Sequence, residues 1–117
     1  MAIRRLKRRP EFLQVASSGQ KAAMPGLVLQ ARPRADEPSL LSDEIRVGFT
    51  ASKKVGGAVA RNRAKRRLRA AADELLKTQG KASHDYVLIA RAETVRRPYA
   101  LLKDDLQRAL KRIGDRR

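Results

Sequence analysis

The strongest chemical signal in the sequence is a run of positive charge between Lys53 and Arg69. The run holds eight basic residues and no acidic residue, the basic ones being Lys53, Lys54, Arg61, Arg63, Lys65, Arg66, Arg67 and Arg69. Guanidinium groups donate paired hydrogen bonds to phosphate, whereas like charges one turn apart destabilise a helix that has no acid to offset them. A solvated face that serves folding alone therefore explains the run poorly. We predict that it binds the phosphates of a polyanion.

Residues that cleave bonds are scarce by comparison. The chain has no cysteine and a single histidine, His84, which excludes a thiolate nucleophile, a disulfide framework and a His-pair metal site. Four acidic pairs, at 36–37, 43–44, 73–74 and 104–105, lie in a loop or on helices outside the basic run. Helix-end charge and solubility explain them more simply than acid–base or two-metal chemistry. We predict no catalytic residue and no metal-binding residue in this chain.

The overall composition points to the same kind of partner. The chain has 117 residues, with 28 basic against 12 acidic side chains, a formal net charge of +16 and 42% apolar residues. This length supports one domain, residues 1–117, and the charge attracts nucleic acid or an anionic membrane. The longest clean apolar run, 87–90, is far shorter than a membrane span, and no signal peptide follows the basic start. We expect a cytoplasmic protein with no membrane partner.

Elements that position the basic run can be predicted from periodicity and from turn residues. The patterns predict a mobile basic arm over 1–9, a helix between Pro10 and Gly19, a strand over 27–32, a loop over 33–44, a strand over 46–52, a helix over about 59–77, a strand over 86–90 and a last helix over 99–113. Three or more strands and three helices favour an α/β (α+β) two-layer sandwich, with about four strands packed by about three helices.

The helix over 59–77 is predicted to carry cations on most of its surface. Its residues Ala64, Leu68, Ala71 and Leu75 form one narrow apolar stripe that can dock on the sheet. Asn62 lies among the cations, where it could hydrogen-bond a phosphate or a 2′-hydroxyl, or serve only as a polar residue near a helix start.

The preceding strand separates two kinds of side chain by alternation. One face of residues 46–52 is apolar, whereas the other carries small and polar side chains, Arg46, Gly48, Thr50 and Ser52. The small residues on that second face leave room for an extended strand of nucleotides.

Residues 46–69 resemble the signature of the bacterial ribonuclease P protein component. The resemblance lies in the triplet Arg61-Asn62-Arg63, followed by Lys65-Arg66-Arg67 and Arg69, after a strand that ends in Ser52-Lys53-Lys54. It extends over nearly the whole chain, from the first helix to the last. The resemblance implies the family's sandwich with a left-handed β-α-β crossover, contrary to the usual right-handed connection.

The resemblance also implies a function and a set of partners. Ribonuclease P removes the 5′ leader of precursor tRNA to form the mature tRNA 5′ end, and in this family the RNA subunit cuts with Mg²⁺. We therefore expect catalytic RNA and precursor tRNA as partners, Mg²⁺ bound mainly by the RNA, and no obligate protein partner. The residues expected to bind the catalytic RNA are Lys53, Lys54, Arg61, Asn62, Arg63, Lys65, Arg66, Arg67 and Arg69.

The expected leader-binding residues are Phe12, Arg46, Thr50 and Ser52. Phe12 has an alternative role in core packing. The family often has aromatic residues at two further positions, where this chain has Ala16 and Gln30. Leader contacts would then depend more on Phe12 and on polar groups.

Other classes of protein fit the residues less well. A ribosomal or general RNA-binding protein shares the size, the charge and the lack of catalytic residues, but it would not affect precursor-tRNA processing. A DNA-binding helix-turn-helix protein would need a compact partner helix just before the basic one. A membrane-surface helix would need larger apolar residues than the alanine-rich stripe, and a stand-alone nuclease would need metal ligands or a base.

Overall fold

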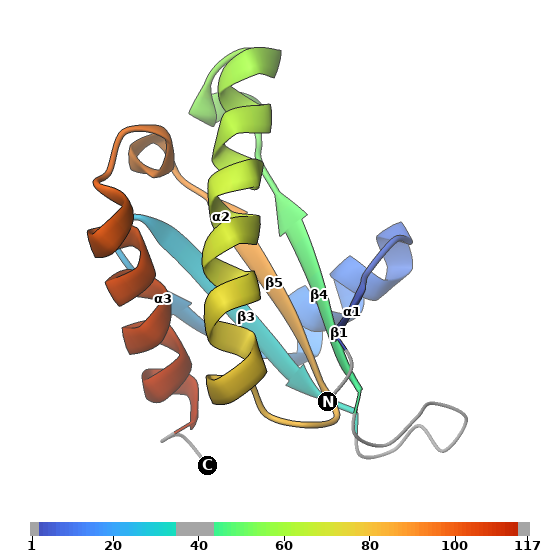
Figure 1. Cartoon of the computed structure of the whole chain (residues 1–117). Coiled ribbons are helices and arrows are strands. Elements are labelled where there is room, and N and C mark those ends of the chain that lie inside the picture. Colours follow the sequence, from blue (N-terminus) through green and yellow to red (C-terminus); the bar gives the residue numbers. More distant parts are fainter. Residues whose placement is uncertain (1–2, 35–43, 115–117) are drawn as a thin grey trace.

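A mixed five-stranded sheet organises the residues that the computed structural model describes, 3–34 and 44–114 (Figure 1). The strand order is β1-β4-β5-β3-β2, with bounds β1 (Ile3–Arg5), β2 (Gln20–Ala23), β3 (Leu27–Pro33), β4 (Ile45–Thr50) and β5 (His84–Ala90). Strand β4 runs parallel to β1 and β5, whereas β3 is antiparallel to β5 and β2. The strands predicted over 27–32, 46–52 and 86–90 are confirmed. The sheet has five strands rather than about four, because two short edge strands, β1 and β2, add to them.

Helices cover both faces of this sheet unequally. The helices are α1 (Arg9–Ser18), α2 (Ala58–Gln79) and α3 (Tyr99–Gly114), with short 3₁₀ turns η1 (Lys53–Val55) and η2 (Ala92–Val95). Figure 1 shows α2 and α3 side by side on one face and α1 on the opposite face. The predicted sandwich of a sheet and packed helices is confirmed, and α1 adds cover to the second face.

The connection from β4 through α2 to β5 is left-handed. The two strands are parallel neighbours in the sheet. In Figure 1 both strands run upward, α2 lies in front of them, and β5 lies to the left of β4. A right-handed crossover would place the second strand to the right. The handedness implied by the family resemblance is therefore confirmed.

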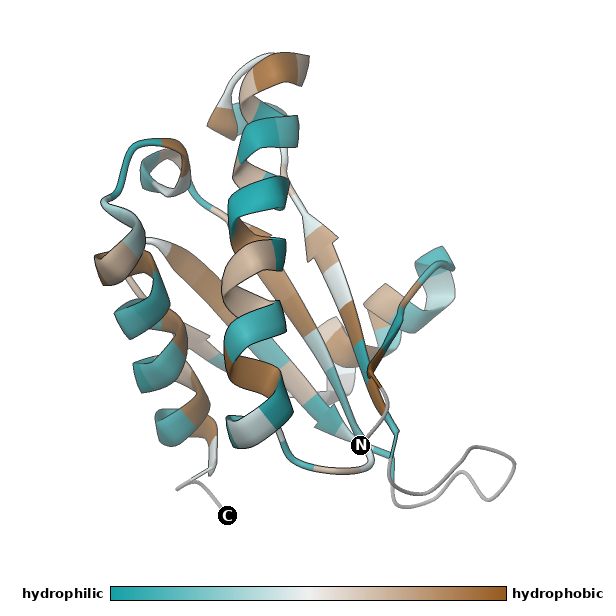
Figure 2. Cartoon of the chain, viewed as in Figure 1, coloured by the Kyte–Doolittle hydropathy of each residue, from teal (hydrophilic) through white to brown (hydrophobic). Residues whose placement is uncertain are grey.

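The main core lies between the sheet and the pair α2 and α3. From β3, Leu27 and Leu29 are fully buried, as the alternation predicts, and from α2 the stripe of Ala64, Leu68 and Ala71 docks against the strands. Figure 2 shows hydrophobic and hydrophilic segments alternating along α2 and α3, as in amphipathic helices that cover a sheet. Burying each large aliphatic side chain contributes about 1.5–3 kcal/mol, so this interface fixes the position of α2.

A smaller core lies under α1 on the other face. Leu6, Val15 and Val87 are buried there, and Phe12 packs partly against them. Gly48 makes this packing possible, because a Cβ atom at that position would lie 2.3 Å from the Phe12 ring. The small residue predicted on this strand face therefore makes room for a side chain of α1.

The N-terminal arm and the flanks of the loop differ from the sequence-based expectation. The mobile arm predicted over 1–9 is wrong for residues 3–5, which form β1 and pair with β4, and the Leu6 N–H continues the pairing by donating to the Val47 carbonyl at 2.9 Å. Pro33 belongs to β3, and the remainder of the predicted loop over 35–43 lies outside the described residues. Strand β4 ends at Thr50, two residues earlier than predicted.

Candidate nucleic-acid interface

The start of α2 is set by two glycines. Gly56 has a φ of 142°, in the region that side chains rarely adopt, and Gly57 is the N-terminal cap residue of the helix. The buried stripe then fixes the rotation of α2 about its axis. The cations lie between the stripe positions, and Figure 2 colours the ribbon at the first turns of α2 mostly hydrophilic.

Six polar residues form what we call the basic face of α2, namely Arg61, Asn62, Arg63, Lys65, Arg66 and Arg69. Asn62, Arg63, Arg66 and Arg69 are exposed, whereas Arg61 and Lys65 are half-buried. Within residues 3–34 and 44–114, no carboxylate forms an ion pair with any cation of this face. The structure therefore brings together six of the predicted RNA-binding residues and leaves their charge uncompensated by those carboxylates.

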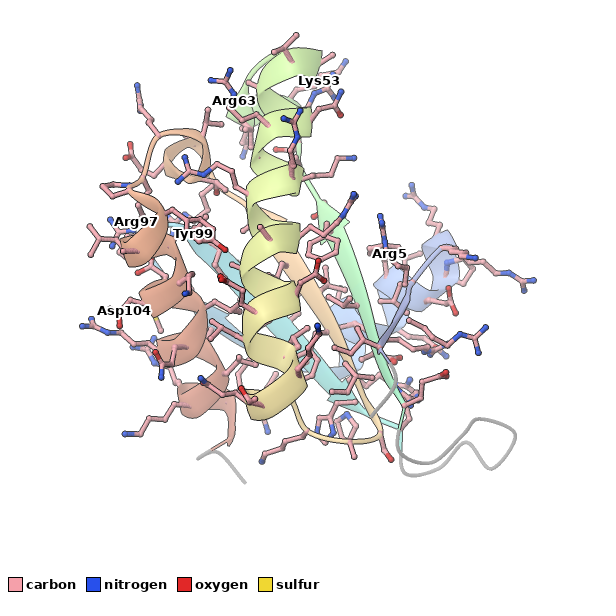
Figure 3. All side chains as sticks on the ribbon, viewed as in Figure 1. Arg5, Lys53, Arg63, Arg97, Tyr99 and Asp104 are labelled. Atoms are coloured by element: carbon pink, nitrogen blue, oxygen red, sulfur yellow. The ribbon has the colours of Figure 1, made fainter. Side chains whose placement is uncertain are left out.

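Turn η1 places two more of the predicted cations next to the N-terminal end of α2. The Ser52 hydroxyl accepts a hydrogen bond from the Lys54 backbone N–H at 3.3 Å and so caps the turn. Lys53 and Lys54 are exposed, and Figure 3 shows Lys53 beside the start of α2. Ser52 was predicted to bind the leader, but the structure places it at this cap, next to the basic face.

Arg67 differs from its neighbours on α2 because it is bound within the protein. Its guanidinium group donates to the Val95 carbonyl at 2.7 Å and also to the Arg97 carbonyl. These carbonyls lie at the end of η2 and in the link to α3. Arg67 therefore holds α2 against this link, whereas the sequence pattern predicted it among the RNA-binding cations.

Phe12 and Thr50, two of the predicted leader-binding residues, line one groove on the α1 side of the sheet. Together with Arg9 and Leu13 they line a shallow, open hollow of about 430 Å³, which we call the leader groove. Leu13 is 54% exposed and Phe12 is half-buried, so apolar surface faces the groove. The groove thus combines an aromatic ring, a hydroxyl and a cation.

Arg46 lies on the same strand face, but its guanidinium group makes three hydrogen bonds to two carboxylates of the protein. Its guanidinium group donates to both carboxylate oxygens of Asp85, at 2.8 and 2.7 Å, and to Glu11 of α1 at 2.8 Å. Partial burial acts to raise the pKa of Glu11, but the backbone N–H groups of Arg8 and Lys7 and the charge of Arg46 outweigh it and lower that pKa. Arg46 therefore anchors α1 to β4 and β5.

No local pattern in the sequence indicated the rest of this ion network. Asp85 is 1% exposed and also pairs with Arg34 at 2.7 Å, while Arg32 lies 3.7 Å away. Arg34 additionally donates to the Glu44 carbonyl. The sequence separations are 39 residues for Arg46 and 51 for Arg34, so no local pattern could have revealed these pairs.

The described carboxylates do not fit a Mg²⁺ site. Asp85 is surrounded by arginines, and Asp105 accepts hydrogen bonds from Arg97 at 2.5 Å and from the Gly26 N–H at 3.0 Å. Among the described residues, no three His, Asp or Glu side chains gather as metal ligands. Mg²⁺ requires oxygen ligands that are free to coordinate, and these two carboxylates are already held by guanidinium and backbone donors.

Comparison with known proteins decides the family. The Ribonuclease P family model matches residues 2–114. This chain belongs to the ribonuclease P protein family. It is 54% identical over 110 residues to the ribonuclease P protein component of Paramagnetospirillum magneticum, covering 94% of this chain and 82% of that protein. It is 50% identical over 112 residues to that of Gluconacetobacter diazotrophicus, covering 96% and 92%.

Solved structures of ribonuclease P proteins share the fold. The protein from Thermotoga maritima superposes with a TM-score of 0.76 at 27% identity, covering 93% of this chain and 96% of that chain. The one from Staphylococcus aureus gives a TM-score of 0.74 at 26% identity.

Family membership confirms the function predicted from the sequence. The chain is the protein subunit of the endoribonuclease that removes the 5′ leader of precursor tRNA. No described helix is both long enough and apolar enough to pass through a bilayer.

Proposed function

We propose that the basic face of α2, together with Lys53 and Lys54, binds the RNA subunit of ribonuclease P through its phosphates. The observation that carries this proposal is the lack of any ion pair between these cations and a described carboxylate. A fully solvated helix gains stability by mixing acids with bases, and this one does not do so before Asp73. Phosphates of an RNA supply the missing negative charge.

The leader groove is proposed to hold the 5′ leader of precursor tRNA. Its Phe12 ring and exposed Leu13 offer a surface for a base, and stacking on an aromatic side chain contributes about 1–3 kcal/mol per base. Thr50 offers a hydroxyl to a ribose or phosphate, and Arg9 offers a cation to the backbone. Such contacts recognise extended single strands with little dependence on sequence.

Arg46 and Ser52 serve this function by positioning other residues. Arg46 joins Asp85 of β5 to Glu11 of α1, and so fixes the helix that carries Phe12 over Gly48. Ser52 caps the turn that presents Lys54 beside the basic face. Arg67 in the same way holds α2 in place through the carbonyls near η2.

The chemical step is proposed to belong to the RNA subunit, with Mg²⁺ held mainly by RNA. The protein contributes positive charge near the bound phosphates, which lowers their mutual repulsion. Less Mg²⁺ is then needed to bring the leader and the catalytic RNA together. We place this activity in the cytoplasm, with catalytic RNA and precursor tRNA as partners and no obligate protein partner.

Cleavage of precursor tRNA at limiting Mg²⁺ tests the proposal. Three reactions are compared: a bacterial ribonuclease P RNA alone, the same RNA with the protein, and the protein alone. We expect cleavage at the mature 5′ end only when both subunits are present, and a loss of that stimulation in Arg63→Gln/Arg66→Gln. Full stimulation by this double variant would contradict the role of the basic face, and cleavage by the protein alone would contradict catalysis by RNA.

A further inference from the structure

Two guanidinium groups converge on one aromatic ring beside the edge of the sheet. The Cζ atom of Arg5 lies 5.7 Å from the centroid of the Phe49 ring, and the Cζ atom of Arg69 lies 5.8 Å from it. Arg5 belongs to β1 and Arg69 to α2, so elements far apart in sequence bring like charges together. Cation–π attraction holds each head group at the ring, but it does not cancel the repulsion between the two cations.

A hollow of about 530 Å³ opens at this point and carries net positive charge. Its lining residues are Ile3, Arg5, Val47, Arg69, Asp73 and Lys77. Three cations and one carboxylate give two positive charges in excess. Among the described residues, Asp73 forms no ion pair with Arg5, Arg69 or Lys77. The hollow is therefore short of negative charge.

Alternation along β1 explains why Arg5, and not its neighbour, reaches this hollow. Ile3 packs partly against the main core on the α2 side, and Arg5, two residues later, is directed to the same side. Arg4 is directed to the other side and pairs with Glu44 at 3.3 Å. Figure 3 shows Arg5 at the edge of the sheet, next to β4.

We propose that Arg5 and Arg69 together bind a single backbone phosphate of the ribonuclease P RNA, with Lys77 at the rim of the site. Guanidinium groups match phosphate oxygens with paired hydrogen bonds, and the Phe49 ring holds both groups in place. The negative charge of one phosphodiester would offset the repulsion between the two guanidinium groups, which their contacts with the ring do not cancel. This inference rests on the proposed function and extends the RNA contact surface from α2 to β1.

A double-mutant cycle on RNA affinity tests whether the two arginines share a phosphate. The affinity for a bacterial ribonuclease P RNA is measured over a range of salt for Arg5→Met, Arg69→Met and the double variant. Methionine keeps an apolar contact with the Phe49 ring while it removes the charge. Arg4→Met is the matched control, since it makes the same change on the opposite side of β1.

We expect each single variant to bind RNA about tenfold more weakly, as for a lost charged hydrogen bond, and the double variant to lose little more. The slope of log affinity against log salt should fall by about one unit in all three variants. Arg4→Met should bind within about twofold of the unaltered protein, because surface substitutions outside a contact have small effects. Unchanged melting temperatures would show that the losses are not structural.

Two results would overturn the inference. One is an Arg5→Met affinity equal to that of Arg4→Met, and the other is a double variant whose loss is the product of the single losses. Arg66→Gln separates this failure from failure of the proposed function. If Arg66→Gln weakens RNA binding and Arg5→Met does not, only the shared phosphate site is wrong. If neither weakens it, the RNA-binding role of the basic face is wrong as well.

Discussion

The ion network around Asp85 and the basic face of α2 are both rich in arginine, yet they differ in what their arginines bind. In the network, Arg34 and Arg46 donate to Asp85 and are largely shielded from solvent. On the basic face, Arg63 and Arg66 are exposed, and no described carboxylate pairs with them. The number of arginines in a segment therefore says less about RNA binding than the presence of partners in the fold.

The largest expected effect is a loss of stability when the ion network around Asp85 is broken. Asp85→Asn leaves Arg34 and Arg46 buried beside a neutral side chain, and breaking such a pair typically costs about 3–5 kcal/mol. We expect a loss of this size in the free energy of unfolding measured with urea. Asp104→Asn is the control, because its pair with Arg108 at 3.0 Å is exposed and surface pairs contribute about 0–1 kcal/mol. Equal losses in both variants would contradict the difference between the regions.

A smaller effect is expected where the basic run itself contains a bound arginine. Arg67→Gln removes charged donors from the Val95 and Arg97 carbonyls, and hydrogen bonds to charged groups contribute about 1.5–3 kcal/mol. The free energy of unfolding should fall by about this amount. Arg66→Gln, one residue earlier, should leave stability within about 0.5 kcal/mol, because Arg66 is exposed. Thermal unfolding of the two variants makes the comparison, and a greater loss in Arg66→Gln would contradict it.

The leader groove depends on the packing of Phe12 over Gly48, and Gly48→Ala tests this placement. The added Cβ would lie 2.3 Å from the Phe12 ring, and relief of such overpacking typically costs about 1–3 kcal/mol. We expect Phe12 to move out of the leader groove, so the holoenzyme should bind precursor tRNA less tightly. Mature tRNA, which has no leader, provides the control and should bind as before. Equal weakening for both RNAs would contradict the placement of the groove.

The smallest effect concerns Glu74, an acid that follows the basic face along α2. The Tyr99 hydroxyl donates to Glu74 at 2.6 Å, which lowers the pKa of that carboxyl. Burial and the Glu74 carboxylate raise the pKa of Tyr99 from 10.0 to about 12. Because the raised pKa belongs to the folded state, this contribution to stability is complete below pH 10 and is lost as the pH rises to about 12.

Tyr99→Phe should remove this pH dependence and raise the pKa of Glu74 toward its ordinary value. Carboxyl titration by NMR measures the second effect directly. An unchanged Glu74 pKa in the variant would contradict the role of Tyr99 and would assign the lowered pKa to Lys103, whose ammonium group lies 3.4 Å from the carboxylate.

Much of the fold was predictable because periodic patterns determine the long elements. The buried stripe of α2 and the alternation in β3 match the structure at Ala64, Leu68, Leu27 and Leu29. The predicted stripe residue Leu75 is only half-buried, and its neighbour Leu76 is fully buried instead. Strands β1 and β2 were missed because they have three and four residues, and because basic or polar residues obscure their pattern. Their pairing with the sheet, rather than local propensity, makes them strands.

The positive charge of the candidate site was predictable from the sequence. Which arginines are bound within the protein, and which are left to bind RNA, was not. The run from Lys53 to Arg69 showed where the cations are. Strand alternation and the basic run placed Arg46 and Arg67 among the RNA contacts. Their partners within the protein lie 39 and 28 residues away along the chain, beyond the reach of any local pattern. Only the folded arrangement of β5 and η2 reveals that these two arginines hold the structure together.

The salt dependence of affinity for ribonuclease P RNA tests most directly whether the unpaired cations of α2 bind the RNA. Arg66→Gln should lower the slope of log affinity against log salt by about one unit, because it removes one phosphate contact. Arg67→Gln should leave the slope unchanged, because that arginine is bound to carbonyls of the protein. The same slope in both variants, whether lowered or unchanged, would contradict the division between RNA-binding and structural arginines.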